Sequence, residues 1–409
     1  MRVLIGFLAI SSTVLADGIP REEYARRRAE LRKSLDGVMI LFGAEEPPDL
    51  RQRYLQETNF LYLSGWHQPG AAMLLSKSEE ILFLPERSRQ TETFMGHRVA
   101  PGDADATETS GFDKVLPVSA IETEFARLAA STKKIYSMSN DPSAEKLKAL
   151  APLHDWPPAA PLIGRLRVIK SPAEIELLTK SAGATVAAHL AAWKAIKPGV
   201  YEYEIAAIMQ QTYFLKGCEG NAYEPIVGSG PNSVILHYSA NRRRADSGEV
   251  MLMDVGAICS DYTMDVTRTV PVNGKFTPRE REIYSIVLGA QKAAIAAVKP
   301  GAKMRGDGSL TELVRDYFNS HGKDLHGEPL GKYFVHGLGH PVGLDVHDEG
   351  DISTLRAGMV ITIEPGLYIP EENIGVRIED TLLVTGSGAK LLSGALPREP
   401  EEIEKLVSK

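Results

Sequence analysis

The amino-acid sequence predicts two domains: an α/β domain at the N-terminus, then a larger domain in which acidic residues and histidines gather on strand-like segments. Three observations support this fold class. The chain of 409 residues is too long for one typical compact core. Strand-like and helical segments alternate in its first part. A run of prolines between residues 152 and 161 then interrupts the pattern and indicates a boundary.

The composition is that of an ordinary globular protein, with 43% hydrophobic residues, 24% charged residues and a net charge of -7. This mildly acidic balance argues against a nucleic-acid-binding protein and against a basic protein of the membrane surface. The two cysteines, Cys218 and Cys259, are too few for a disulfide framework and form no CxxC zinc motif. Their number alone leaves the compartment open.

The first residues have the order of a secretory signal. Arg2 precedes a short apolar stretch, residues 3–10, and small residues lead to Ala16, after which we expect cleavage. The apolar stretch is too short to span a bilayer comfortably, so no stable membrane insertion is expected. The sequence therefore predicts an exported protein, periplasmic or secreted, that loses residues 1–16. An uncleaved start of a cytoplasmic protein is the alternative.

Residues 17–160 are predicted to form the α/β domain. A helix is expected over residues 21–35, where Tyr24, Leu31 and Leu35 recur at helical spacing. Short apolar runs, some of them ending at glycine or proline, indicate strands in this domain. These runs cover residues 38–42, 60–63, 72–75 and 81–84. No motif in this domain carries chemistry.

The second domain is predicted to cover residues 161–409, and its first helix has a clear start. Ser171 is a suitable N-cap, Pro172 suits the first helical position, and Glu174 completes a capping box. Pro198 then ends the helix. Downstream of it, acids and histidines appear within sequences that otherwise indicate strands.

Two acids interrupt apolar strands. Asp254 lies in residues 250–256 and Asp265 lies in residues 262–269. A buried carboxylate is costly unless it is neutralised or paired. Two antiparallel strands joined by a turn at residues 259–261 would place both acids on one face, where a cation between them would relieve their repulsion. Taken alone, the pair could equally be one surface acid and one acid in an ion pair.

Three histidines follow among glycines. His336 and His340 are four residues apart, as in the HExxH zinc motif, but Gly337 stands where that motif needs a glutamate and the glycines oppose a helix. The glycines suit a backbone that packs closely around a site. A lone histidine is more often structural, but three histidines in this segment, with His347 as the third, indicate a functional site.

Two further strands carry acids. Glu364 ends the strand predicted at residues 359–364, and Glu379 lies in the strand predicted at residues 375–384. A solvent-exposed strand end and a plain ion pair between Arg377 and Glu379 are the alternatives. In the functional interpretation, Glu379 binds metal, and Arg377 on the same face holds a ligand or fixes a carboxylate.

The chain thus offers four acids and one histidine, which are mostly oxygen donors. Such a set favours two divalent ions, with Mn²⁺ ahead of Zn²⁺ or Co²⁺. Two ions would neutralise four carboxylates, activate water and polarise a carbonyl. At this point the ordered set resembles the metal ligands of the pita-bread metallopeptidases, which include methionine aminopeptidase, aminopeptidase P and proline dipeptidase. The matching residues are Asp254, Asp265, His340, Glu364 and Glu379.

Other segments narrow the resemblance. HGLGHPVGLDVHD at residues 336–348 and RVIKSP at residues 167–172 are similar to the aminopeptidase P and prolidase branch, and residues 21–75 resemble the N-terminal domain of bacterial aminopeptidase P. The resemblance implies a creatinase-like α/β N-terminal domain. It also implies an α+β pita-bread catalytic domain, whose two related halves cup the metals.

The resemblance also implies a role for each metal ligand. Asp254 would chelate one ion, and Asp265 and Glu379 would bridge the two ions. His340 and Glu364 would complete the shell of the second ion.

Further roles concern the substrate. Glu364 would also act as general base or acid on the attacking water. His336 and His347 would hydrogen-bond the substrate and the developing oxyanion, and His237 matches a substrate-side histidine of the family. Arg377 would support the first aspartate or groups beside the scissile bond.

The sequence therefore predicts an Xaa-Pro aminopeptidase, which removes the N-terminal residue ahead of proline from peptide substrates. An Xaa-Pro dipeptidase (prolidase) is the alternative and differs only in substrate length. A metal-free creatinase-like C–N hydrolase or a non-enzymatic binding module is disfavoured because all five ligands are present. The segments between His340 and Glu364 and between Glu364 and Glu379 are short and lack the longer insertions of some family members. Because such loops shape the mouth of the pocket, the preferred substrate length is in doubt. The family also implies a homo-oligomer, either a dimer or a tetramer.

Overall fold

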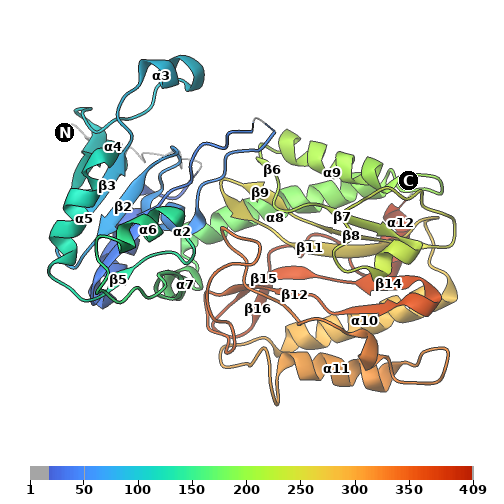
Figure 1. Ribbon diagram of the computed structural model, residues 1–409. Helices are drawn as coiled ribbons and strands as arrows, with labels where there is room; N and C mark the ends of the chain where they lie inside the picture. The colour runs from blue at the N-terminus through green and yellow to red at the C-terminus, as the bar shows by residue number, and fades with distance from the viewer. Residues whose placement is uncertain (1–17, 50, 408–409) are drawn as a thin grey trace, which may run out of the picture.

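The computed structural model describes residues 18–49 and 51–407. Two domains lie side by side, the N-terminal domain in blue to teal and the second in green to red (Figure 1). The predicted signal, residues 1–16, lies outside the described residues. Within the described part of the chain, no helix combines the length and the apolar character needed to cross a membrane.

The N-terminal domain is built on one mixed sheet. Its strands are β1 (Val38–Phe42), β2 (Ala72–Leu75), β3 (Glu80–Leu84), β4 (Lys114–Pro117) and β5 (Ile135–Tyr136). They lie in the order β4-β3-β2-β1-β5. β2 is antiparallel to β1 and β3, whereas the outer strands β4 and β5 are parallel to β3 and β1, respectively. The helices of this domain are α1 (Arg21–Ser34), α2 (Thr58–Ser64), α3 (Arg89–Met95), α4 (Ala106–Ser110), the short helix η1 (Val118–Ala120), α5 (Ile121–Ala129) and α6 (Pro142–Lys148).

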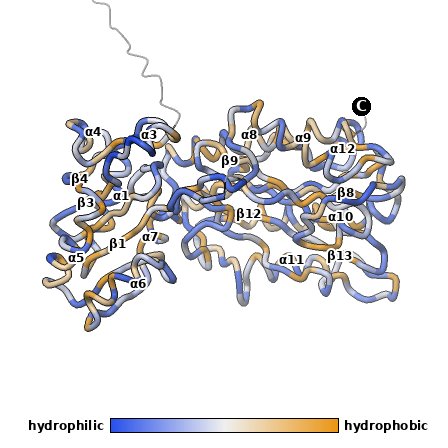
Figure 2. The backbone as a smooth tube through the Cα atoms, turned by 45° about the horizontal axis from the view of Figure 1, so that its top comes forward, coloured by the Kyte–Doolittle hydropathy of each residue, from blue (hydrophilic) through white to orange (hydrophobic). Residues whose placement is uncertain are grey.

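Both faces of this sheet are covered, as its continuous apolar strands require. Met39 and Met73 pack on the side of α1 and α2, whereas Ile40 and Ile81 pack with Phe125 of α5 on the other side. Successive side chains of a strand point to opposite faces, so each face receives alternate residues. Figure 2 shows hydrophobic segments along these strands.

The strand predicted at residues 60–63 is wrong, because this segment forms helix α2. The Glu57 carboxylate caps the helix by accepting hydrogen bonds from the backbone nitrogens of Asn59 at 3.2 Å and Phe60 at 2.6 Å. Gly65 ends the helix with a φ of 64°. Since residues 59–64 are all buried, the apolar run has no period that separates a strand from a helix.

Two helices lead into the second domain, α7 (Ala160–Arg167) and α8 (Pro172–Trp193). The predicted capping box is confirmed. The Ser171 hydroxyl accepts from the Glu174 backbone nitrogen at 3.2 Å, and the Ser171 backbone nitrogen donates to the Glu174 carboxylate at 2.9 Å. Because α7 spans the boundary predicted between residues 160 and 165, that boundary stays a prediction.

The second domain places antiparallel strands between two helical layers (Figure 1). α8 and α9 (Glu202–Leu215) form one layer, and α10 (Pro278–Ala297) and α11 (Leu310–His321) form the other. Short helices η2 (Gly230–Val234), η3 (Leu330–Tyr333), η4 (Pro370–Glu372) and α12 (Pro400–Leu406) complete the domain. The strands are β6 (Gly220–Asn221), β7 (Ile226–Ser229), β8 (Val250–Val255), β9 (Ala257–Cys259), β10 (Tyr262–Thr263), β11 (Val266–Pro271), β12 (Val360–Ile363), β13 (Gly366–Ile369), β14 (Ile374–Arg377), β15 (Asp380–Val384) and β16 (Ala389–Leu391).

These strands form the sheets β11-β8-β7, β12-β15-β16, β10-β9-β6 and β13-β14. The single strand predicted over residues 375–384 is therefore wrong in one respect. It is divided at Ile378 and Glu379 into β14 and β15, which belong to different sheets. Glu379 lies outside both pairings, and its backbone nitrogen donates instead to the Thr267 carbonyl of β11 at 3.1 Å.

A buried ion-pair network connects the two domains. Arg167 of α7 donates to the Asn59 side chain at 2.9 Å and to Asp348 at 2.5 Å, and Lys170 donates to Asp348 at 2.9 Å. The side chains of Arg167, Lys170 and Asp348 are at most 2% exposed. The network therefore fixes the loop that carries His347 against the N-terminal domain.

Candidate metal centre

Asp254 and Asp265 lie at the ends of two paired strands. β8 and β11 are antiparallel, with Asp254 opposite Thr267, and Asp265 directly precedes β11. The predicted turn between them is present at Ser260 and Asp261, whose φ values are 51° and 70°. Asp254 is half-buried and Asp265 is buried. The hairpin thus brings the two carboxylates together, as the sequence pattern indicated.

Tyr223 lies between the two aspartates and was not identified from the sequence. Its hydroxyl is 2.6 Å from Asp254 Oδ1 and 2.5 Å from Asp265 Oδ1. One hydroxyl proton serves one acceptor at a time, so it cannot neutralise the pair. Burial and these two carboxylates raise the pKa of Tyr223 well above its usual value. No motif marks Tyr223, because its partners come from distant positions in the sequence.

The loop that carries His340 pairs with β12, and this pairing sets its distance from Glu364. The Thr362 backbone nitrogen donates to the His340 carbonyl at 2.9 Å, and the Glu364 backbone nitrogen donates to the Leu338 carbonyl at 2.9 Å. A Cβ added at Gly339 would lie 2.0 Å from the Thr362 carbonyl oxygen. Only glycine therefore permits this close approach, which confirms the expectation from the glycine-rich sequence.

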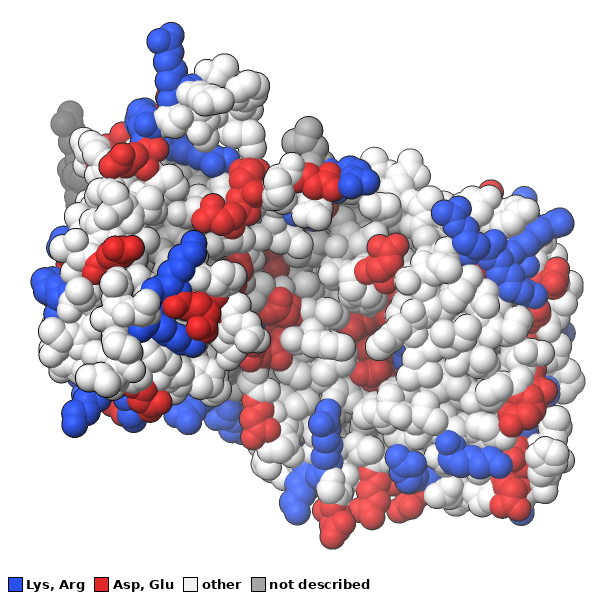
Figure 3. Space-filling model, in the orientation of Figure 1, with Lys and Arg blue, Asp and Glu red and all other residues white. Residues whose placement is uncertain are grey.

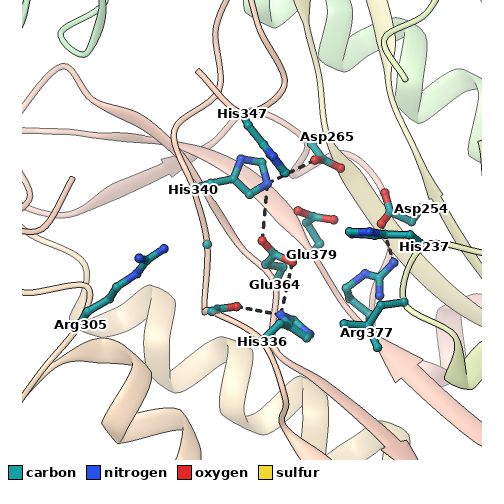
Figure 4. Close-up of a pocket in the computed structure, with 13 residues that line it drawn as sticks. His237, Asp254, Asp265, Arg305, His336, His340, His347, Glu364, Arg377 and Glu379 are labelled. Carbon is teal, nitrogen blue, oxygen red and sulfur yellow. Dashed lines mark hydrogen bonds and ion pairs between the residues drawn. The ribbon is translucent and has the colours of Figure 1, made fainter. Parts of the chain in front are cut away.

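Asp265, His340 and Glu379 form a compact donor group, with one ligand atom of each within 4.8 Å of the others. His340 Nε2 is 3.4 Å from Asp265 Oδ2 and 3.5 Å from Glu364 Oε1. Both separations are long for hydrogen bonds. Donor atoms that each lie about 2.1 Å from one ion are about 3.0–3.4 Å apart, so these separations suit a shared cation. Figure 4 shows the side chains facing one another.

The electrostatics of the group also fit cations. Burial, and then the neighbouring carboxylates, raise the pKa values of Asp265 and Glu379 well above their usual range. Burial raises the pKa of Glu364 as well, although the nearby His340 and Arg377 lower it. Divalent ions would lower these pKa values again, because they stabilise the ionised carboxylates that burial disfavours. The donor set is therefore suited to hold divalent metal.

Arg377 and Glu379 meet at Thr267 and face the same space. Arg377 Nη2 is 2.5 Å from Asp254 Oδ2, and its Nε donates to the Thr267 hydroxyl at 3.1 Å. That hydroxyl donates to Glu379 Oε2 at 2.6 Å. Arg377 also donates to the Tyr368 hydroxyl at 2.6 Å. The buried guanidinium thus fixes Asp254 and forms no ion pair with Glu379 within the described residues.

His336 is held as a neutral ring by this arrangement. Since Arg377 donates to Tyr368, the Tyr368 hydroxyl donates to His336 Nε2 at 2.8 Å, and His336 Nδ1 donates to the Gly337 carbonyl at 2.8 Å. Burial and the charge of Arg377 lower the pKa of His336 to about 4. Its Nδ1 is 3.7 Å from Glu364 Oε2, so it borders the metal group.

His237 and His347 lie at the exposed side of the site. His347 packs edge-on against the His340 ring, with centroids 4.2 Å apart. His237 follows η2 in a loop. Within the described residues no side-chain hydrogen bond occupies either ring, so both can serve a bound molecule.

All residues predicted to belong to the site line one cavity of about 370 Å³. Figure 3 shows acidic side chains gathered in a hollow between the domains. The sequence did not identify Arg305, which also lines this cavity, from the loop between α10 and α11. The remaining lining residues are Leu236, His237, Asp254, Asp265, His336, Gly337, Gly339, His340, His347, Glu364, Arg377 and Glu379.

Cys218 and Cys259 form a disulfide, which their number alone did not indicate. The bond joins the segment between α9 and β6 to Cys259 of β9. The loop between Cys218 and β7 carries Tyr223. The disulfide therefore fixes that loop to the hairpin that presents both aspartates.

Comparisons with known proteins agree with this site. The model of metallopeptidase family M24 matches residues 176–386, and that of the aminopeptidase P N-terminal domain matches residues 24–136. An Xaa-Pro aminopeptidase of Haemophilus influenzae is 33% identical over 95% of this chain and 98% of its own length. An Xaa-Pro dipeptidase of Pyrococcus horikoshii is 38% identical over 88% of this chain and 93% of its own length.

Solved structures give the same result. Aminopeptidase P of Escherichia coli with the inhibitor Pro-Leu has a TM-score of 0.85 and 30% identity, covering 95% of this chain and 98% of that one. Proline aminopeptidase P II of Yersinia pestis has a TM-score of 0.86 and 30% identity, covering 95% and 99%. The chain therefore belongs to the metallopeptidase family M24, in its pita-bread aminopeptidase P branch.

Proposed function

We propose that this protein is an Xaa-Pro aminopeptidase that hydrolyses the bond between the N-terminal residue of a peptide and a following proline. The observation that carries the proposal is the cavity in which the metal-binding acids, His340 and the further histidines converge. The match to Xaa-Pro aminopeptidases over 95% of the chain supports the choice of substrate. The complete set of acids favours a metallopeptidase over a metal-free creatinase-like hydrolase or a binding module.

The site binds divalent metal ions, as its family implies, and we propose two Mn²⁺ ions. Asp254, Asp265, His340, Glu364 and Glu379 would hold these ions. The predominance of carboxylate oxygens supports Mn²⁺ over the softer Zn²⁺, and Co²⁺ is a further option. Bound ions supply the Lewis acidity that activates water and polarises the scissile carbonyl.

Glu364 is suited to move the proton. Its carboxylate lies at the cavity wall beside His340 and His336, with oxygens 3.5 Å from His340 Nε2 and 3.7 Å from His336 Nδ1. We assign it the transfer of a proton from the attacking water to the departing proline nitrogen. Tyr368 holds His336 in its neutral tautomer, and the His336 ring borders Glu364, with Nδ1 3.7 Å from the carboxylate (Figure 4).

The exposed histidines are suited to bind substrate. The rings of His237 and His347 face the cavity from different loops. We assign them hydrogen bonds to the peptide and to the oxyanion that develops on the scissile carbonyl. We assign Arg377 to fixing Asp254, because each of its three guanidinium nitrogens already donates to a protein group, Asp254, Thr267 or Tyr368.

The test is hydrolysis of Xaa-Pro-Yaa, Xaa-Pro and Xaa-Ala-Yaa peptides by the Mn²⁺-loaded protein and by Glu364→Gln. Cleavage of Xaa-Pro-Yaa before proline, with kcat lowered at least about 100-fold in the variant, is the expected result. No turnover of any peptide would refute the peptidase proposal.

An Xaa-Pro dipeptidase is the second candidate. The 38% identity to the dipeptidase of Pyrococcus horikoshii, against 33% for the aminopeptidase of Haemophilus influenzae, favours it, although the match covers less of this chain. The same assay decides, because turnover of Xaa-Pro alone would identify a dipeptidase.

We further propose that the protein is exported and forms a dimer or tetramer. The order of residues 1–16 and the disulfide between Cys218 and Cys259 support export, since disulfides persist in oxidising compartments. Sequencing of the secreted protein should give Asp17 as its N-terminus, and an intact Met1 would contradict cleavage.

Light scattering after gel filtration should give a mass above that of one chain, and a monomer would contradict oligomerisation.

A further inference from the structure

Arg305 places a second guanidinium in the wall of the catalytic cavity. Figure 4 shows it across the cavity from Asp254 and Arg377, with the guanidinium turned inward. A Cβ added at Gly337 would lie 3.7 Å from Arg305 Nη2. The charge therefore lies against the backbone beside His336, close to where a substrate bond would be cut.

The loop holds Arg305 in place although the side chain is exposed. The preceding residue, Met304, is 1% exposed, and its backbone nitrogen donates to the Ser353 carbonyl at 3.0 Å. The Thr311 hydroxyl donates to the Met304 carbonyl at 2.6 Å. The guanidinium thus extends from a fixed point of the backbone at the cavity wall.

Arg305 has no protein partner that uses its charge. Within the described residues, no hydrogen bond or ion pair involves its guanidinium, whereas each guanidinium nitrogen of Arg377 donates to one of Asp254, Thr267 and Tyr368. Metal ions in the site would neutralise its carboxylates, so they would not need Arg305 as a counter-charge. Five donors in a planar fork remain free at the cavity wall, and this geometry matches a carboxylate.

We propose that Arg305 binds a carboxylate of the peptide substrate and so determines which peptides the enzyme prefers. The inference rests on the proposed peptidase function. The carboxylate has two possible sources, the C-terminus of a short peptide or an acidic side chain of a longer one. A cavity of about 370 Å³ holds one small molecule, so the far end of a short peptide lies within reach of its wall.

The test compares the metal-loaded full chain with Arg305→Gln, Arg305→Lys and the control Lys303→Gln. Lys303 is exposed on the same loop and does not line the cavity, so its variant makes the same charge change outside the site. The substrates are Xaa-Pro-Yaa as free acid and as C-terminal amide, and amides with Glu or Gln in the third position. Binding of Pro-Leu and its amide is measured in parallel by calorimetry.

Arg305→Gln should lower kcat/KM about tenfold on peptides that carry the recognised carboxylate and leave neutral amides unchanged. Arg305→Lys should retain part of the preference, and Lys303→Gln should retain all of it. If kcat/KM of Arg305→Gln falls only on the free acid, the recognised carboxylate is the peptide C-terminus. If it falls only on the amide with Glu in the third position, the recognised carboxylate is the acidic side chain.

Equal effects on all peptides would overturn the inference, while cleavage of the neutral amides would still uphold the proposed function. If no peptide is cleaved, the proposed function fails, and calorimetry then decides whether Arg305 recognises a carboxylate. Tighter binding of Pro-Leu than of its amide in the wild type, lost in Arg305→Gln, then supports carboxylate recognition. Equal affinities overturn it.

Discussion

Removing the Tyr223 hydroxyl tests how the protein organises its metal ligands. Tyr223→Phe deletes the group that lies 2.6 Å from Asp254 Oδ1 and 2.5 Å from Asp265 Oδ1. Because one proton serves both contacts, we count one hydrogen bond to a charged acceptor, worth about 2 kcal/mol. That energy corresponds to an affinity change of about 30-fold, within the range of about 10- to 100-fold found when groups that orient metal ligands are removed.

The assay is the Kd for Mn²⁺, measured by competition with a chelator, together with kcat/KM at saturating metal. Tyr213→Phe is the matched control, because the buried Tyr213 hydroxyl of α9 has no hydrogen-bond partner among the described residues. We expect weaker Mn²⁺ binding in Tyr223→Phe and unchanged binding in Tyr213→Phe. If Tyr223→Phe binds Mn²⁺ as tightly as the wild type, Tyr223 does not position the aspartates and the reasoning is refuted.

Two further predictions concern the scaffold of the site. Gly339→Ala should destabilise the protein by about 3 kcal/mol and weaken metal binding, because its Cβ would overlap the Thr362 carbonyl oxygen; unchanged urea unfolding would contradict this. Asp348 should contribute to acid sensitivity. Burial raises the pKa of Asp348, but the charges of Lys170 and Arg167 lower it by more. The net pKa therefore lies below the usual value of about 3.9. Its stabilisation is therefore present above that value and lost as the pH falls through the folded-state pKa. The stability gap between wild type and Asp348→Asn should narrow at low pH, and a constant gap would count against this assignment.

The parts of the site that the sequence predicted follow local rules. An acid inside an apolar strand is informative by itself, and the turn between Asp254 and Asp265 could be placed from the residues that separate them. The capping box at Ser171 and Glu174 is likewise a local pattern. The glycine beside His340 indicated close backbone packing, and the structure shows the carbonyl that requires it.

The parts that the sequence did not predict depend on tertiary contacts. Helix α2 is buried all round, so its apolar run lacked the periodicity of an amphipathic helix. Tyr223 and Arg305 belong to loops whose position relative to the acids is set by packing between distant segments. Pairing of Cys218 with Cys259 likewise depends on β6, which follows Cys218, lying beside β9, and two cysteines alone do not reveal this.

The measurement that tests the central claim most directly is a metal titration of the metal-free protein with Xaa-Pro-Yaa as substrate. We predict no cleavage without metal, activity that rises with added Mn²⁺, and saturation at two bound ions per chain. Asp265→Asn, which alters a predicted bridging ligand, should abolish both the high-affinity binding and the activity. Full activity of the metal-free protein, or metal binding without any cleavage before proline, would contradict the account.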